Sequence, residues 1–121
     1  MPMKLPSAQH PITITPNPRR VRVRWNGKVV ADTQSALTLA EASMPRVQYI
    51  PRADADMSAF VATDHKTYCP FKGDASYFTL VVDGKRAENA VWSYVEPYPA
   101  VSLIESHLAF YPDRVDAIEE G

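Results

Sequence analysis

Eleven prolines are spread along the 121 residues of this chain, and they limit the length of any helix. A proline inside a helix removes a backbone hydrogen bond and clashes with the preceding turn. Between the prolines, short apolar runs alternate with turn-forming residues. This pattern is typical of short antiparallel strands. We therefore expect a mainly β fold of small antiparallel sheets, with one or two short helical turns.

The clearest strand pair spans residues 20–30, where every second residue is apolar until Asn26-Gly27. This dipeptide favours a two-residue hairpin turn because both positions tolerate a positive φ. A second pair is predicted over residues 79–94, with Asp83-Gly84 near its turn. The remaining predictions are a strand or helical turn at 36–42, a short strand at 47–51, a turn or one helical turn at 54–60, helical character at 101–107, and a last hairpin joining 108–111 to 115–118.

The length and composition predict a single domain. The chain is 45% apolar, which is enough for a core, and it has the size of one ordinary domain. We expect an extended N-terminal arm at residues 1–18, with Ile12 and Ile14 against the body, and one β-rich domain at residues 19–121. The N-terminus lacks the apolar segment of a signal peptide. The single cysteine excludes an intrachain disulfide, and a cytoplasmic location is expected.

The charges are balanced, with 13 basic and 14 acidic residues. No overall field favours a nucleic acid or a membrane surface, so neither partner is expected. A local basic stripe could still meet an anion such as RNA, although such a stripe is more often the solvated face of a strand. Its members are Arg19, Arg20, Arg22, Arg24 and Lys28.

Residues 65–78, HKTYCPFKGDASYF, hold the only cysteine. His65, Thr67 and Cys69 share one face of an extended strand, which suggests a nucleophile with a base. Yet His65 and Cys69 would lie roughly 14 Å apart on such a strand, too far for a direct hydrogen bond. The alternatives are His107 as the base, or Lys72 as a nearby cation that lowers the pKa of the thiol. Cys69 can instead be a small core residue, as free cysteines often are.

The same segment predicts a binding site. Lys72 precedes Gly73 in a tight turn, where an ammonium group and backbone N–H groups can hold an anion. An arginine can likewise hold a carboxylate, and tyrosine and tryptophan side chains often line pockets for small molecules. The predicted ligand-binding residues are Tyr49, Arg52, His65, Thr67, Lys72, Tyr77, Trp92 and Tyr94. The histidines and the cysteine show no paired spacing for a metal, and no cofactor is expected.

Several segments resemble one known family: residues 49–54 (YIPRAD), residues 67–77 (TYCPFKGDASY), residues 92–97 with Trp92 and Tyr94, and residues 104–111. The resemblance is to the bacterial and fungal domain of unknown function 427 and covers roughly residues 21–115. It implies a small β-rich domain of the β-tent kind. Related β-tent proteins hold zinc with two CxxC knuckles, which this chain lacks. The nucleotidyltransferase label that the family has carried has no support in a glycine loop or paired acidic residues here.

The resemblance implies no established catalytic residue. It places ten residues on the family's motif positions: Tyr49, Arg52, Asp54, Thr67, Cys69, Lys72, Gly73, Tyr77, Trp92 and Tyr94. The favoured hypothesis is a domain that binds a small anionic ligand in an aromatic-lined pocket. The alternatives are an enzyme, hydrolase or transferase, that uses Cys69 or His65, and a homodimeric module that pairs through an exposed strand edge.

Overall fold

The protein is known from a computed structural model, of which residues 3–121 are described. These residues form ten strands and three 3-10 helices. The strands are β1 Ile12–Pro16, β2 Val21–Trp25, β3 Lys28–Thr33, β4 Leu37–Glu41, β5 Val47–Tyr49, β6 Phe60–Cys69, β7 Gly73–Val82, β8 Lys85–Ser93, β9 Ala109–Phe110 and β10 Ala117–Glu120; the helices are η1 Arg52–Asp54, η2 Met57–Ala59 and η3 Pro99–Ile104. With 52% strand and 10% helix, the predicted mainly β fold is confirmed.

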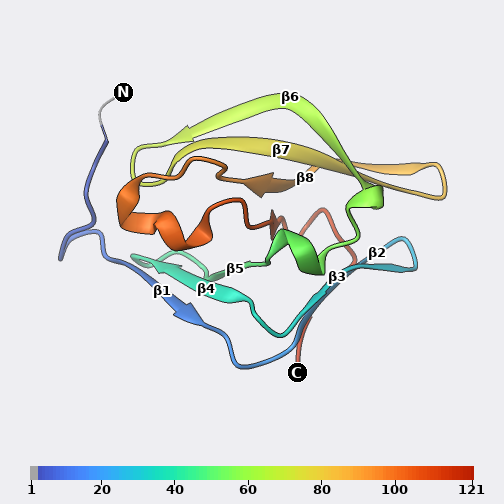
Figure 1. Ribbon diagram of the computed structural model, residues 1–121, viewed down its shortest axis with the longest axis horizontal. Coiled ribbons are helices and arrows are strands. Elements are labelled where there is room, and N and C mark those ends of the chain that lie inside the picture. The colour runs from blue at the N-terminus through green and yellow to red at the C-terminus, as the bar shows by residue number, and fades with distance from the viewer. Residues whose placement is uncertain (1–2) are drawn as a thin grey trace.

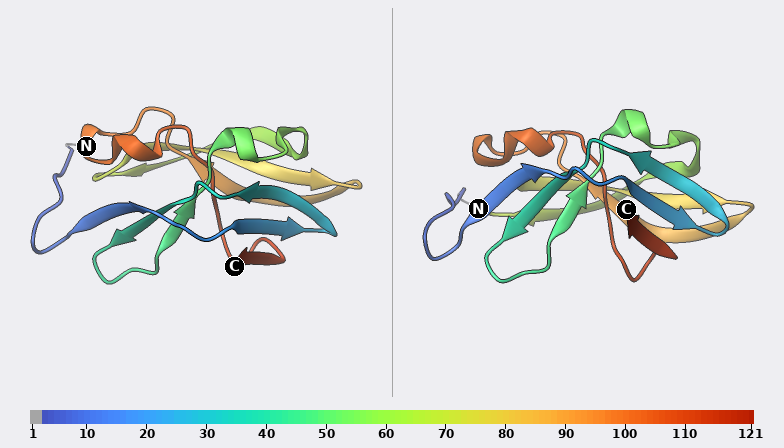
Figure 2. Two further views of the ribbon diagram at one scale, coloured as in Figure 1. Left: turned by 60° about the horizontal axis from the view of Figure 1, so that its bottom comes forward. Right: turned by 90° about the horizontal axis from the view of Figure 1, so that it is seen from below.

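The strands form three antiparallel sheets, with the orders β1-β4-β5, β10-β2-β3 and β6-β7-β8-β9. The four-stranded sheet makes one layer, and the two smaller sheets lie side by side in the other (Figures 1 and 2). The 3-10 helices lie between the layers on the side that faces the viewer in Figure 1. No helix of the described residues has the length and apolar character needed to cross a membrane.

The two predicted hairpins are confirmed. Strands β2 and β3 turn at Asn26-Gly27, and strands β7 and β8 turn at Asp83-Gly84. All four turn residues have a positive φ, between 48° and 78°. In β2 the valines are fully buried while the arginines between them reach solvent. The alternation of the sequence therefore places β2 with one face on the core.

The predicted last hairpin is wrong. Strand β9 pairs with β8, and β10 pairs with β2 in a different sheet. Between them the chain makes a tight turn, in which the Arg114 amide donates to the Tyr111 carbonyl, and Val115 is buried in the core. The Asp116 amide then donates to the Arg24 carbonyl, which aligns β10 with β2. This long-range bond decides the pairing, and local turn residues do not reveal it.

The segments whose type was open take definite forms. Residues 36–42 contain strand β4, and residues 54–60 contain η2. The helical character expected at residues 101–107 lies slightly earlier, in η3, which begins at Pro99. A proline suits the start of a helix because its missing N–H would have no partner there.

Part of the N-terminal arm belongs to a sheet. Residues 12–16 form β1, which pairs with β4 along its whole length. Before β1, the Lys4 amide donates to the carbonyl of Pro70, 2.8 Å away. The arm therefore lies across the end of the β6–β7 hairpin.

Two apolar clusters fill the fold. The larger one gathers the buried residues of β2, β3 and β8, together with Leu80 and Leu108. The smaller one surrounds Leu39, Val101 and Ile104 and contains the buried tyrosines Tyr49, Tyr77 and Tyr94. Tyrosine needs a partner or water for its hydroxyl, so the smaller cluster is the more polar of the two.

Asn17 links the two smaller sheets, β1-β4-β5 and β10-β2-β3, through its side chain. Its side chain amide donates to Gln48 on β5 at 3.0 Å and to Glu120 on β10 at 2.9 Å. Its carbonyl oxygen accepts from the Arg19 amide at 2.9 Å. Asn17 is only 7% exposed. These bonds hold the two smaller sheets next to each other.

Replacing Asn17 by alanine should lower the free energy of unfolding by about 2 kcal/mol, because three largely buried hydrogen bonds are lost. Chemical denaturation measures this change. Gln34→Ala removes an amide from an exposed position and is the control, with an expected effect within about 0.5 kcal/mol. Equal effects of the two substitutions would contradict the joining role of Asn17.

Candidate functional site

A cavity of about 380 Å³ opens beside the smaller apolar cluster. Its size lies at the lower end of the range for small-molecule pockets. Sheet β1-β4-β5 supplies one side, and sheet β6-β7-β8-β9 supplies the other. It is lined by Leu39, Glu41, Met44, Pro45, Val47, Tyr49, Thr67, Tyr68, Cys69, Lys72, Tyr77, Trp92, Tyr94 and Tyr111.

Strand alternation aims these side chains at the cavity. Leu39 and Glu41 share one face of β4, and their neighbours Val47 and Tyr49 share the same face of β5. The odd-numbered residues Thr67 and Cys69 of β6 face them from the opposite sheet. Because a strand sends alternate residues to opposite faces, a short run on each strand is enough to build each wall.

A buried ion pair lies at the cavity wall. The Lys72 ammonium group donates to Oε1 of Glu41, and each side chain is only 9% exposed. Lys72 lies in the turn between β6 and β7, while Glu41 ends β4. The pair therefore bridges two sheets that are otherwise joined in the backbone by the isolated bridge between Ile50 and Leu108. Breaking such a pair leaves a buried charge alone and typically costs about 3–5 kcal/mol.

Gly73 shapes the turn that carries Lys72. Its φ of +106° lies in a region that residues with a side chain rarely adopt. The backbone amide of Lys72 donates to the Cys69 carbonyl, and the Lys72 carbonyl accepts from the Tyr98 amide. The turn is thus held at both ends, and its lysine points at Glu41.

Lys72 retains unused hydrogen-bonding capacity. An ammonium group has three donors, and one of them is bound to Glu41. The structure of residues 3–121 gives its Nζ atom no second partner. Two donors of an almost buried cation are therefore available beside the cavity.

His10 completes the charged cluster from the N-terminal arm. Its Nε2 lies 2.7 Å from Oε2 of Glu41, and its ring stacks on Phe71 with 4.0 Å between centroids. Burial raises the pKa of Glu41, but the hydrogen bonds and charges of Lys72 and His10 outweigh it. The pKa of Glu41 therefore lies below its ordinary value, and the carboxylate is ionised at neutral pH.

Most tyrosine hydroxyl groups of the cavity are already bonded. The Tyr77 hydroxyl lies 2.9 Å from the Thr67 hydroxyl and 3.0 Å from that of Tyr111. The Trp92 indole N–H donates to the Tyr49 hydroxyl at 3.2 Å. Burial and the bond to Tyr77 raise the pKa of Tyr111 to about 12. The phenols of Tyr49 and Tyr111 therefore stay neutral at physiological pH, and the bonded hydroxyl groups form a fixed wall.

Tyr94 differs from its neighbours. It is 6% exposed, and its hydroxyl has no hydrogen-bond partner among residues 3–121. Within that part of the chain every fully enclosed polar side-chain atom has a partner, so the Tyr94 oxygen must reach the open space of the cavity that the residue lines. Burial raises its pKa far above the ordinary value. The cavity therefore offers a neutral hydroxyl donor in addition to the unused donors of Lys72.

The structure brings most predicted site residues together and leaves two aside. Tyr49, Thr67, Lys72, Tyr77, Trp92 and Tyr94 all line the cavity, as does the candidate nucleophile Cys69. Arg52 does not: it donates to the Ser106 carbonyl and the Ser93 hydroxyl, both at 3.2 Å, and lies over the Phe78 ring. These contacts give it a structural role in anchoring η1.

The two candidate bases do not line the cavity. His65 is exposed on β6 and meets the Tyr77 ring edge-on, with 4.5 Å between centroids. The Nδ1 atom of His107 lies 2.9 Å from the Glu105 carbonyl. Asp54 accepts from the Thr33 hydroxyl at 2.7 Å. Within residues 3–121 no three histidine, cysteine or acidic side chains gather as metal ligands.

Sequence reasoning missed Glu41, His10 and Tyr111. Glu41 had a signal, because it shares the inward parity of Leu37 and Leu39 on β4. An acidic residue on the apolar face of a strand requires a partner. His10 had no local signal, since its contact spans 31 residues of sequence.

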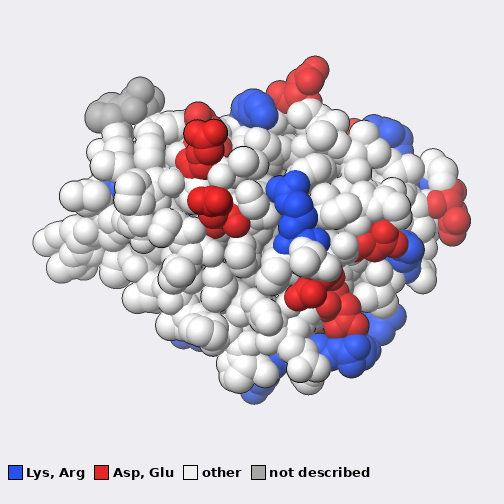
Figure 3. Space-filling model, viewed as in Figure 1, with Lys and Arg blue, Asp and Glu red and all other residues white. Residues whose placement is uncertain are grey.

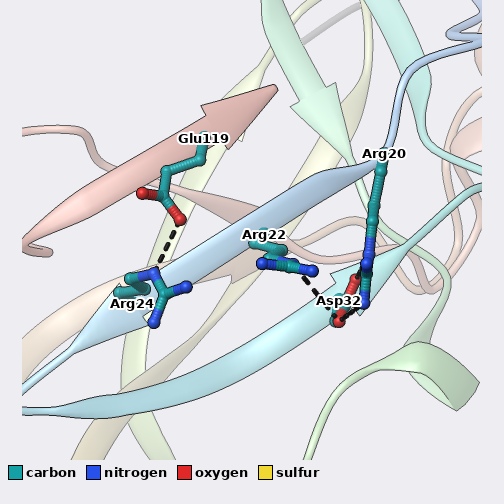
Figure 4. Close-up of polar contacts among 5 residues, drawn as sticks. All are labelled: Arg20, Arg22, Arg24, Asp32 and Glu119. Atoms are coloured by element: carbon teal, nitrogen blue, oxygen red, sulfur yellow. Dashed lines mark hydrogen bonds and ion pairs between the residues drawn. The ribbon is translucent and has the colours of Figure 1, made fainter. Parts of the chain in front are cut away.

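The basic stripe lies away from this cavity and is largely neutralised. Arg20 and Arg22 both approach Asp32, and Arg24 pairs with Glu119 (Figure 4). The space-filling view also shows acidic and basic groups interspersed on one face of the molecule (Figure 3). Such exposed pairs contribute little to stability.

The comparison with protein families can now be set beside this geometry. A family model described as a domain of unknown function (DUF427) matches residues 13–121. The chain belongs to this family. No curated protein matches it. The DUF427 match includes Glu41, Lys72 and all the tyrosines of the cavity, whereas His10 precedes it.

Glu41→Gln should lower the free energy of unfolding by about 3 kcal/mol at pH 7, because Lys72 loses its counter-charge. The stability that Glu41 contributes is present above its ordinary pKa of 4.5 and is lost as the pH falls through its lower folded pKa. The difference between wild type and variant should therefore shrink on acidification, as measured by urea denaturation between pH 7 and pH 3.

Glu88→Gln is the matched control, since Glu88 pairs with Arg86 on the surface and is 64% exposed. Its effect should be small at every pH. A difference for Glu41→Gln that stays constant between pH 7 and pH 3 would refute the buried pair as its source.

Proposed function

We propose that this domain binds a small molecule with an oxygen acceptor group, such as a carboxylate, in the tyrosine-lined cavity. The observation that carries the proposal is the set of unused donors at the wall: two from Lys72 and one from Tyr94. Buried polar groups rarely remain without partners. A ligand carboxylate would accept from both residues at once.

The charge balance of the cluster favours a ligand of low charge. The carboxylate of Glu41 offsets the ammonium group of Lys72, and His10 adds a positive charge only when it is protonated. A ligand with one negative group would therefore meet a donor-rich wall without a strong opposing field. Bonds between a charged group and a donor are about twice as strong as neutral ones, so one such group can orient the ligand.

The remaining walls suit a flat apolar body. Tyr49 and Trp92 meet edge to face with 6.3 Å between centroids, and Trp92 lies 4.6 Å from Tyr111. The aromatic rings keep these positions through their hydroxyl and indole bonds. Preformed walls reduce the entropy lost when a ligand binds. An aromatic carboxylate combines the flat body with the acceptor group.

Binding is favoured over catalysis by the surroundings of Cys69. Neither His65 nor His107 lines the cavity beside its thiol, and the one cation that does, Lys72, is paired with Glu41. A cysteine nucleophile usually depends on a nearby base or cation for its activation. Cys69 then serves best as a reporter of what occupies the cavity.

Benzoate is the first probe, with benzyl alcohol as its uncharged counterpart. Benzoate should raise the melting temperature and slow the alkylation of Cys69 by iodoacetamide, because a bound ligand stabilises the native state and shields the thiol. Benzyl alcohol should have a smaller effect than benzoate on both the melting temperature and the alkylation rate. If neither benzoate nor a panel of other small carboxylates has any effect, the proposed function fails.

Tyr94→Phe tests the geometry of the site. It removes one hydroxyl that has no partner among residues 3–121, so the unliganded variant should match the wild type in stability within about 0.5 kcal/mol. Its affinity for benzoate should fall about five- to tenfold, since one hydrogen bond is lost. Isothermal titration calorimetry measures this change.

Tyr98→Phe is the matched control. The Tyr98 hydroxyl bonds to that of Tyr68 at 2.7 Å, and Tyr98 does not line the cavity. Its substitution should leave benzoate binding unchanged. Unaltered affinity in Tyr94→Phe, or an equal loss in both variants, would count against the donor role of Tyr94.

A further inference from the structure

A second and larger hollow lies on the opposite face of sheet β1-β4-β5. It is a groove of about 1190 Å³. The same alternation that turns Leu39 and Glu41 toward the tyrosine cavity turns Thr38 and Ala40 toward this groove. In the right-hand view of Figure 2, the β4–β5 loop and the loop that precedes β10 project on the same side of the molecule. Residues of both segments line the groove.

One wall of the groove is apolar. Trp92 and Phe110 come from the four-stranded sheet, and Ile118 comes from β10. Pro112 adds a further apolar surface between them. Apolar and aromatic walls with a few polar groups are characteristic of ligand sites. This wall can cover a flat or extended hydrocarbon body.

The opposite wall is polar but leaves little charge exposed. The hydroxyl groups of Thr13 and Thr15 project from β1. The Thr38 hydroxyl donates to the side-chain oxygen Oε1 of Gln48 at 2.9 Å. The carboxylate of Glu120 accepts from Asn17. These groups are bonded to one another or small, so they do not close the groove.

Two arginines at the groove have no partner for their guanidinium groups. Arg19 and Arg46 line the groove and are exposed, and neither makes a side-chain hydrogen bond or ion pair within residues 3–121. Every other arginine of the chain does: Arg20, Arg22, Arg24, Arg52, Arg86 and Arg114. Both unpaired guanidinium groups therefore belong to residues that line this groove.

We propose that the groove is a binding site for an amphiphilic organic anion, separate from the tyrosine cavity. The apolar body of the ligand lies against Trp92 and Phe110. Its carboxylate or sulfonate group is held by Arg19 and Arg46. Guanidinium groups suit this task because they bind such anions with paired hydrogen bonds. The two positive charges of Arg19 and Arg46 also outnumber the single negative charge of Glu120 at the groove.

The probe is 8-anilino-1-naphthalenesulfonate, whose fluorescence rises in an apolar site, and its uncharged analogue is N-phenyl-1-naphthylamine. The sulfonate should bind at one site per chain and more tightly than the analogue. The double variant Arg19→Gln/Arg46→Gln should bind the sulfonate about tenfold more weakly, because two charge-assisted contacts are lost. Its binding of the analogue should not change. Added salt should weaken the binding of the sulfonate but not that of the uncharged analogue.

Two control variants show whether binding depends on this groove and on its own arginines. Arg24→Gln/Arg86→Gln removes the same charge from arginines that pair with Glu119 and Glu88, and it should leave sulfonate binding unchanged. Thr15→Trp fills the groove from an exposed position on β1 and should abolish binding of both probes.

Tyr94 lines the tyrosine cavity and not the groove, so a variant at this residue separates the two sites. Tyr94→Phe should bind the sulfonate like the wild type, whatever its affinity for benzoate. The proposal is overturned if Arg19→Gln/Arg46→Gln binds the sulfonate as the wild type does, if both arginine double variants lose affinity equally, or if Tyr94→Phe loses it.

Discussion

The ion pair between Glu41 and Lys72 is the side-chain constraint that, with the backbone bridge between Ile50 and Leu108, holds the two layers together. It joins the end of β4 to the β6–β7 turn, two places that no backbone ladder connects. A nearly buried charge tolerates little displacement of its partner, because the attraction falls with distance while the loss of hydration remains. The turn at Gly73, the stacking of His10 on Phe71 and the inward face of β4 all serve to keep these two groups in contact.

This constraint explains why a cavity persists beside an otherwise packed cluster. Tyrosines are large, and their hydroxyl groups cannot be pressed into an apolar core without partners. The Tyr77 hydroxyl bonds to the hydroxyl groups of Thr67 and Tyr111, and these bonds hold the two tyrosine rings in position. The ion pair holds the opposite wall in place. The space between them is therefore a result of polar groups that must be satisfied at fixed positions, and not of poor packing.

The sequence predicted the parts of the fold that rest on local chemistry. Asn26-Gly27 and Asp83-Gly84 specify their turns through positive φ values, and the hairpins around them follow. The pairing of β10 with β2 could not be predicted, because it depends on backbone bonds between residues 90 or more apart in the chain. Local turn residues at Pro112 instead suggested a hairpin that does not form.

The candidate site shows the same division between what residue type predicts and what depends on long-range contacts. Lys72, Tyr77 and Trp92 were predicted from their residue types, and they do line one cavity. Arg52 has an equally suggestive type but is bonded to Ser93 and Ser106. Residue type alone does not tell a free guanidinium group from one engaged in the fold. Conversely, His10 could not be predicted, because its contact with Glu41 spans 31 residues of sequence.

Trp92 lines both the tyrosine cavity and the larger groove. Met44, Pro45 and Val47 also line both, so the two hollows adjoin at the β4–β5 loop. If both hollows hold ligands as proposed, an occupant of one that displaces a shared side chain changes the shape of the other. By thermodynamic reciprocity each occupant would then change the affinity for the other by the same factor.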